Sequence, residues 1–133
     1  MLDSGQKKRV LYVDDEIVNL ELFMFSFEED YDVITAISAM QGLEILKKID
    51  IKVVLSDLKM PDMSGLEFIE RVKKQTPDKI CMLLTAYAEP DVLIKALNSE
   101  MIFRYMIKPW DRYELKKTIE SAFERYGQNI PTN

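Results

Sequence analysis

The sequence predicts an α/β fold in which a five-stranded parallel sheet, with strand order 2-1-3-4-5, is covered by helices on both faces. Five short apolar runs alternate with five longer amphipathic runs along the 133 residues. This alternation is typical of a doubly wound sheet with right-handed crossovers. The amphipathic runs also begin with residues that favour helix starts. A chain of this length is enough for one domain with a substantial core.

The apolar runs identify the strands. They are Arg9–Val13, Tyr31–Ala36, Ile51–Ser56, Ile80–Leu84 and Phe103–Ile107. The first, third and fourth contain nearly continuous apolar segments, as parallel strands do when helices cover both of their faces. The second begins with alternating polar residues, so we expect it at an edge of the sheet.

Capping residues mark the helix starts. In three places a Ser or Asp is followed three residues later by Gln or Glu, with the spacing of a capping box: Ser38 with Gln41, Ser64 with Glu67, and Asp111 with Glu114. Pro90 suits the first turn of a further helix, where a backbone N–H would have no partner in any case. We therefore assign residues 9–126 to one domain, with a lead-in over 1–8 and a polar tail over 127–133.

Composition excludes several classes of function. The formal net charge of −5 argues against nucleic-acid binding by this domain. The absence of histidine excludes histidine metal ligands, a serine–histidine triad and a histidine phosphodonor within this chain. The single cysteine, Cys81, lies in an apolar run and is expected to be a buried, inert thiol. No apolar segment approaches the length of a membrane span and no apolar leader opens the sequence, so we expect no membrane contact and a cytoplasmic protein.

Polar residues follow four of the predicted strands at the point where each strand ends. Asp14 and Asp15 follow the first strand, and Asp57 follows the third. Thr85 and Lys108 come at the ends of the fourth and fifth strands. Ligands of open parallel sheets bind beyond the carboxyl ends of the strands, where the strand order reverses. With the order 2-1-3-4-5, the first and third strands are neighbours, so we expect the three carboxylates to meet there with the other two residues on the rim.

This set of groups suits phosphoryl transfer to a carboxylate. Clustered carboxylates need a compensating cation, and Mg²⁺ is the natural choice because it prefers oxygen ligands and keeps waters that a phosphate can replace. Asp57 can attack phosphorus and form an acyl phosphate. Lys108 and the Thr85 hydroxyl can then offer a positive charge and a hydrogen bond to the phosphoryl oxygens. Each residue alone would be a helix cap, a turn former or a surface residue, but five at one edge favour the functional interpretation.

The segments around these residues carry a family resemblance. They are Val13–Glu16 (VDDE), Asp57–Gly65 (DLKMPDMSG), Thr85–Tyr87 (TAY) and Tyr105–Trp110 (YMIKPW). Together they resemble the receiver domains of two-component response regulators, over about residues 9–126. The resemblance implies a flavodoxin-like fold of five βα units, with Asp57 as the phosphoacceptor and Lys108 beside it.

The resemblance also implies a metal site and partners. Asp14, Asp15, Asp57 and the backbone carbonyl of Lys59 would hold Mg²⁺, for which Mn²⁺ can substitute. The phosphodonor would be a sensor histidine kinase or a histidine phosphotransfer protein, and the chain would catalyse only its own phosphorylation and dephosphorylation. Trp110, which follows Lys108 and Pro109, is similar to a residue of receivers that are often joined to an effector domain in the native chain.

Switching and lifetime residues are implied in the same way. Thr85 and Tyr105 would be the switch residues, and Tyr105 matches the aromatic side chain that turns inward on activation. The Lys108–Pro109 peptide bond would be cis. Lys59 and Tyr87, each two residues after a site residue, are expected at the mouth of the site, where they would tune the lifetime of the phosphorylated state.

Three other classes of protein share parts of this pattern. A phosphatase of the haloacid dehalogenase type also forms an aspartyl phosphate, but it has Asp two residues after its nucleophile, where this chain has Lys59. A flavodoxin-like cofactor carrier needs a Ser/Thr/Gly-rich phosphate loop after the first strand, where this chain has acidic residues. A pseudo-receiver, which binds partners without being phosphorylated, remains the main alternative, although all five site residues are present.

The predicted first helix, over residues 17–27, has eight apolar residues among its eleven. At about 100° per residue they cover more than one face of the helix. The resemblance places three of them inward (Leu22, Phe23 and Phe27) and leaves three outward (Leu20, Met24 and Phe25). A contiguous outward patch would indicate a partner surface, and in the family this helix commonly docks the histidine-bearing partner.

Overall fold

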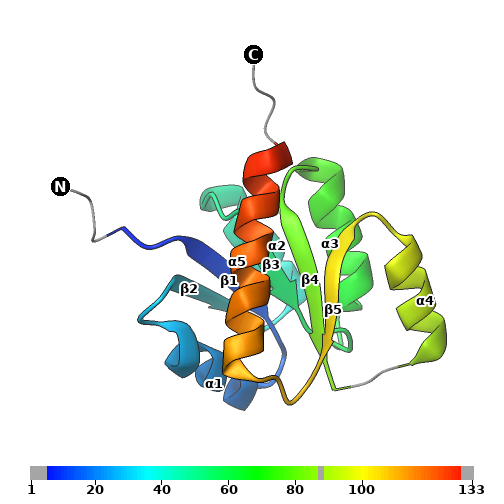
Figure 1. Cartoon of the computed structure of the whole chain (residues 1–133). Coiled ribbons are helices and arrows are strands. Elements are labelled where there is room, and N and C mark those ends of the chain that lie inside the picture. The colour runs from blue at the N-terminus through cyan, green and yellow to red at the C-terminus, as the bar shows by residue number, and fades with distance from the viewer. Residues whose placement is uncertain (1–5, 87–88, 130–133) are drawn as a thin grey trace.

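The computed structural model describes residues 6–86 and 89–129 and contains five parallel strands in the order β2-β1-β3-β4-β5 (Figure 1). The predicted fold, a flavodoxin-like doubly wound sheet, is therefore confirmed. The strands are β1 (Arg9–Val13), β2 (Asp32–Ala36), β3 (Val53–Ser56), β4 (Ile80–Thr85) and β5 (Ile102–Ile107). The helices are α1 (Ile17–Phe27), α2 (Ala39–Lys48), α3 (Gly65–Gln75), α4 (Pro90–Asn98) and α5 (Arg112–Asn129).

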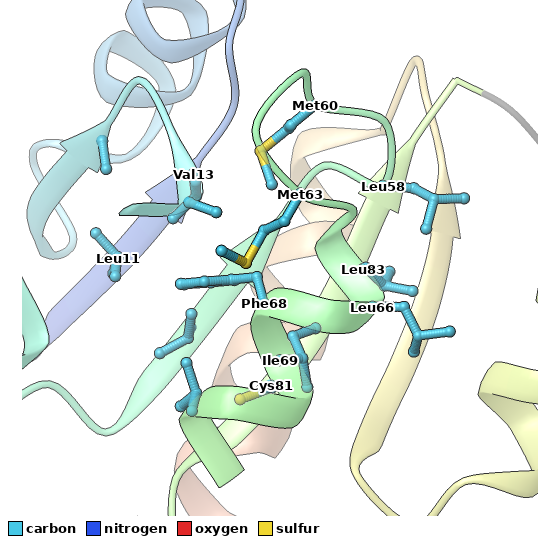
Figure 2. Packing of buried hydrophobic residues seen from close by; sticks show 14 of the residues in the cluster. Leu11, Val13, Leu58, Met60, Met63, Leu66, Phe68, Ile69, Cys81 and Leu83 are labelled. Carbon is cyan, nitrogen blue, oxygen red and sulfur yellow. The ribbon is translucent and has the colours of Figure 1, made fainter. Parts of the chain in front are cut away.

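Helices cover both faces of the sheet and close two separate apolar cores. Successive strand residues point to opposite faces, so β1 sends Leu11 and Val13 to one core and Val10 and Tyr12 to the other. Helices α2, α3 and α4 close the first core, and Figure 2 shows Phe68 of α3 among its side chains. Helices α1 and α5 close the second core on the other side of the sheet (Figure 1). Among the described helices, none is both long and apolar enough to cross a membrane.

The strands differ in burial according to their place in the sheet. Strands β3 and β4 are buried along their whole length and β1 nearly so, whereas β2 and β5 lie at the edges and are partly exposed. The edge position predicted for residues 31–36 is thus confirmed. Cys81 of β4 is fully buried, and burial raises the pKa of its thiol to about 12. The thiol therefore stays protonated at neutral pH, as expected for an inert cysteine.

The predicted capping residues make the expected hydrogen bonds. The side-chain oxygens of Ser38, Ser64 and Asp111 accept from the backbone N–H three residues later, at 3.1, 3.1 and 2.9 Å. Each such cap stabilises its helix start by about 1 kcal/mol. Pro90 lies in the first turn of α4, as predicted. Helix α2 has a second cap, because Asp62 in the loop after β3 accepts from the Met40 N–H at 3.0 Å and so ties this loop to α2.

The buried face of α1 differs from the expected one. Leu20, Phe23 and Phe27 are buried, whereas Leu22 is 53% exposed and Phe25 is 78% exposed. The inward position expected for Leu22 and the outward position expected for Leu20 are therefore wrong. At about 100° per residue, positions separated by three or four residues share a helix face, and Leu22 lies about 200° from Leu20.

The outward face of α1 is nevertheless apolar. Ile17, Val18 and Phe25 are each more than half exposed. Met24, which was expected to point outward, is partly buried against the second core. Helix α1 therefore does expose apolar side chains, as predicted, but of the three residues that the resemblance placed outward only Phe25 is exposed.

Gly65, the first residue of α3, allows α3 to approach the end of β3 closely. A Cβ atom at this position would lie 2.0 Å from the backbone carbonyl oxygen of Asp57. The Gly65 N–H donates to the Leu58 carbonyl at 2.7 Å, and the Ser56 hydroxyl donates to the Asp57 carbonyl at 2.8 Å. The missing side chain of Gly65 therefore helps to fix the backbone that carries Asp57.

We expect Gly65→Ala to lower the free energy of unfolding by about 2–3 kcal/mol, because the added methyl group would push against backbone that cannot move freely. Denaturation in urea would measure this change. Gly127→Ala in α5 is the matched control, since nothing lies within 4 Å of a Cβ atom there. That substitution should be neutral or stabilising by up to about 1 kcal/mol. Equal losses in the two variants would contradict the packing argument.

Candidate functional site

The residues predicted to form the site converge at the carboxyl edge of the sheet. Strands β1 and β3 are neighbours with Val13 in register with Ser56, so the residues that follow them, Asp14 and Asp57, lie side by side. The Asp57 N–H donates to the Val13 carbonyl at 2.8 Å. One carboxylate oxygen from each of Asp14, Asp15 and Asp57 lies within 4.8 Å of the others. The predicted cluster of three acids is therefore present.

Asp14 is fully buried and its carboxylate accepts four hydrogen bonds. Oδ2 accepts from the Tyr12 hydroxyl at 2.6 Å, from Lys108 Nζ at 2.7 Å and from Asn19 Nδ2 at 3.2 Å. Oδ1 accepts from the Glu16 N–H at 2.9 Å. Burial, and then the hydrogen bond to Asp14, raise the pKa of Tyr12, so its phenol remains a donor at neutral pH. These bonds hold the carboxylate in one orientation.

Lys108 supplies the positive charge of the site. Its ammonium lies 2.7 Å from Asp14 Oδ2 and 3.3 Å from Asp57 Oδ1, and only 14% of its side chain is exposed. Its backbone N–H donates to the Thr85 carbonyl at 2.8 Å, which holds the end of β5 against β4. The Lys108–Pro109 bond is cis, as the resemblance implied. One ammonium thus faces two buried carboxylates.

Lys108 does not fully compensate the negative charge of Asp57. Burial is the largest cause that raises the pKa of Asp57, the Lys108 ammonium opposes it, and the Asp14 carboxylate raises it further, with a net upward direction. A further cation would therefore stabilise the ionised form of Asp57. Three carboxylates at one point offer the hard oxygen ligands that suit a divalent ion such as Mg²⁺.

The other predicted residues within the described part of the chain lie on β4, on β5 and in the loop after β3. Thr85 is fully buried at the end of β4, and Tyr105 is partly buried on the neighbouring strand β5. Lys59 is half-exposed, and its Nζ lies 3.4 Å from Glu89 Oε2, which joins the loop after β3 to the segment before α4. Tyr87, the second residue predicted to tune the lifetime of the phosphorylated state, lies outside the described residues.

The sequence interpretation missed two residues that orient Asp14. Tyr12 precedes Asp14 by two positions and therefore points to the same side of the chain, a signal that strand periodicity could have supplied. Asn19 lies in the first turn of α1, where its amide donates to both Asp14 and Glu16. Its contribution depends on how α1 begins, and no spacing rule in the sequence indicates it.

Comparison with known proteins agrees with the fold and with the geometry of the site. Residues 10–120 match the family described as the response regulator receiver domain. The chain belongs to this family. The receiver domain is 32% identical over 117 residues to the hydrogenase transcriptional regulatory protein HoxA of Bradyrhizobium diazoefficiens. The aligned residues cover 88% of this chain and 24% of that protein. The chain spans about a quarter of the length of the curated relatives that it matches.

Solved structures of receiver domains share the fold of this one. The signal receiver domain of an HD domain-containing protein from Pseudomonas fluorescens has a TM-score of 0.88 at 29% identity, covering 93% of this chain and 100% of that one. The response regulator protein TrrA of Thermotoga maritima, in complex with Mg²⁺ and BeF, has a TM-score of 0.77 at 32% identity, covering 86% of this chain and 98% of that one. Membership of the family supports a phosphorylation-activated switch and not a phosphatase or a flavin carrier.

Substitution of Asp57 should reveal the cost of burying its negative charge, which the neighbouring Asp14 carboxylate increases. Folding raises the pKa of Asp57 above its ordinary value of 3.8, so the folded receiver domain holds this proton more tightly than the unfolded chain. The resulting stabilisation is fully present below pH 3.8 and is lost as the pH rises through the raised pKa. Without metal, we expect Asp57→Asn to increase the free energy of unfolding by about 1 kcal/mol at neutral pH.

The gain from Asp57→Asn should shrink near pH 3, where the native carboxyl is also uncharged, and should shrink when Mg²⁺ is added at neutral pH. Urea denaturation of both proteins under the three conditions would measure it. A gain of the same size at both pH values would show that the burial of a charged carboxylate is not its cause.

Proposed function

We propose that this receiver domain accepts a phosphoryl group on Asp57 from a phosphohistidine partner, in an Mg²⁺-dependent reaction, and that the phosphoryl group switches the state of the domain. The position of Lys108 carries this proposal. Its ammonium lies 3.3 Å from Asp57 Oδ1, so oxygens of a phosphoryl group on Asp57 would meet a fixed positive charge that needs no reorganisation. These 133 residues contain no histidine, so the phosphohistidine lies outside them, and the donor that we propose is a sensor histidine kinase or a histidine phosphotransfer protein.

In this reaction Asp57 is the nucleophile. A carboxylate oxygen attacks phosphorus, an O–P bond forms as the P–N bond of the phosphohistidine breaks, and the leaving imidazole keeps the electron pair and takes up a proton. Lys108 balances the charge on the phosphoryl oxygens, and the Thr85 hydroxyl donates a hydrogen bond to one of them. Asp14, held by its own hydrogen bonds, keeps Lys108 in place.

A divalent ion would complete the charge balance. Asp14, Asp15, Asp57 and the backbone carbonyl of Lys59 are the proposed residues that hold Mg²⁺, or Mn²⁺ in its place. The ion supplies the charge compensation that lets an anionic phosphodonor approach three carboxylates. The clustering of the three acids within 4.8 Å supports this assignment.

We further propose that Thr85 and Tyr105 are the switch residues and that Lys59 and Tyr87 tune the lifetime of the phosphorylated state. The burial of Thr85 beside the site supports the first assignment. Residues 9–126 form the proposed receiver unit, flanked by the lead-in over 1–8 and the tail over 127–133, which agrees with the family match over 10–120. An effector domain in the native chain and a cytoplasmic location are part of the same proposal.

Asp57→Asn should abolish phosphoryl uptake from acetyl phosphate with Mg²⁺, because the amide has the same shape but is not a usable nucleophile. Intact-mass measurement would detect uptake in the native protein and none in the variant. Asp50→Asn is the matched control. Asp50 is exposed and precedes the start of β3, at the end of the strand opposite to Asp57, so this substitution should leave uptake unchanged. Equal modification of the native and Asp57→Asn proteins would overturn the assignment, and no modification of either would favour a pseudo-receiver.

Excess chelator should stop phosphoryl uptake, and Mg²⁺ or Mn²⁺ should restore it, because three unscreened carboxylates repel an anionic donor. Binding gives an independent measurement: Mg²⁺ should raise the Tm of the native protein, and should raise it less in Asp15→Asn. An uptake rate that does not change in chelator would exclude the proposed role of the acid cluster.

A further inference from the structure

Glu89 lies where three parts of the receiver domain meet. Its Oε2 lies 3.4 Å from the Nζ of Lys59, in the loop that follows Asp57. Its backbone carbonyl accepts from the Leu93 N–H at 2.9 Å and so begins α4. Burial first, and then the Glu89 carboxylate, raise the pKa of Tyr105 on β5. The Glu89 carboxylate therefore contacts the loop over residues 57–64 (the phosphorylation loop), while its backbone carbonyl belongs to the first turn of α4. The charge of the same carboxylate also acts on a proposed switch residue.

The Glu89 side chain does not cap its own helix and contacts Lys59 instead. The side chains of Ser38 and Ser64, which precede α2 and α3, accept hydrogen bonds from their helices, whereas Glu89 makes no such bond. Among the described side chains of α4, Ala96 alone is buried. Because the described side chains of α4 bury little surface, an ionic contact between the start of α4 and the phosphorylation loop has more influence on the position of α4 than it would on a deeply packed helix.

Phosphorylation would create a competitor for the Lys59 ammonium. The side chains of Lys59 and Glu89 are 52% and 49% exposed, so solvent weakens their attraction. A phosphoryl group on Asp57 would bring a charge of about −1.5 to −2 and three acceptor oxygens within two residues of Lys59. It would also lie in a more buried and less screened place, because Asp57 itself is only 8% exposed.

We propose that Glu89 is a positioning residue for Lys59: it holds the Lys59 ammonium away from Asp57 in the unphosphorylated domain and gives it up to a phosphoryl oxygen after transfer. The first turn of α4 then loses its ionic tie to the phosphorylation loop. This inference rests on the proposed phosphorylation of Asp57 and adds to it the residue that regulates Lys59.

Equilibrium binding of beryllofluoride with Mg²⁺, followed by fluorine NMR, tests the competition without the chemistry of hydrolysis. The four proteins are the native domain, Glu89→Gln, Lys59→Ala and the double variant. Glu89→Gln should tighten binding about three-fold, the size expected for a half-exposed ion pair, and Lys59→Ala should weaken it. In the Lys59→Ala background, Glu89→Gln should have no effect, because there is no ammonium left to compete for.

Two controls make the result specific. Glu124→Gln, at an exposed position of α5, changes the net charge equally and should leave binding unchanged. Glu89→Asp keeps the charge but shortens the reach to Lys59, so it should tighten binding less than Glu89→Gln does. Urea denaturation of each protein would establish that it is folded.

Tightening by Glu89→Gln that is equal with and without Lys59 would overturn the inference, since simple removal of a negative charge would then explain it. No effect of Glu89→Gln, no effect of Lys59→Ala, or equal tightening by Glu124→Gln would overturn it as well. If the native domain does not bind beryllofluoride, or Asp57→Asn binds it equally well, the proposed function fails instead. The two failures are thus distinguishable.

Discussion

The contact of the Lys108 ammonium with Asp14 and Asp57 is the interaction on which the rest of the site depends. Two carboxylates buried at the end of a parallel sheet would destabilise the fold if they had no compensating charge. A single lysine at the end of β5 faces both, at 2.7 and 3.3 Å. Tyr12, Asn19 and the start of α1 complete the hydrogen bonds of Asp14. Much of the local structure thus serves to keep one ammonium and one carboxylate in place.

The negative charges of this site are only partly compensated. Asp14 accepts four hydrogen bonds, but the pKa of Asp57 is still raised, first by burial, so Asp57 lacks the support that Asp14 has. Full charge compensation would weaken the attraction of the site for a further cation. The raised pKa thus marks a local loss of stability at neutral pH, at the carboxylate that we propose as the phosphoacceptor.

The sequence was informative wherever a single local rule decides the structure. Apolar runs located the central strands, capping residues located helix starts, and the ends of the strands located Asp14, Asp57 and Lys108, because strand order alone brings these ends together. Local rules left the inward face of α1 open, because eight apolar residues among eleven fit more than one face, and the face taken from the family resemblance wrongly had Leu22 inward in place of Leu20. They also gave no sign of the contact between Lys59 and Glu89, since it depends on the paths of two loops and on side-chain rotamers.

The long sequence separation within the site has a consequence for how the protein is made. Lys108 and Asp14 are 94 residues apart, and β5 is the last strand of this sheet in chain order, so it is synthesised after the other four. Asp57 is therefore exposed on the growing chain well before its lysine can arrive, and the two meet only when β5 has docked against β4. An incomplete or misassembled sheet has Asp57 but not the ammonium beside it. The proposed phosphoryl transfer depends on that ammonium, so it would take place only in a domain whose sheet is complete.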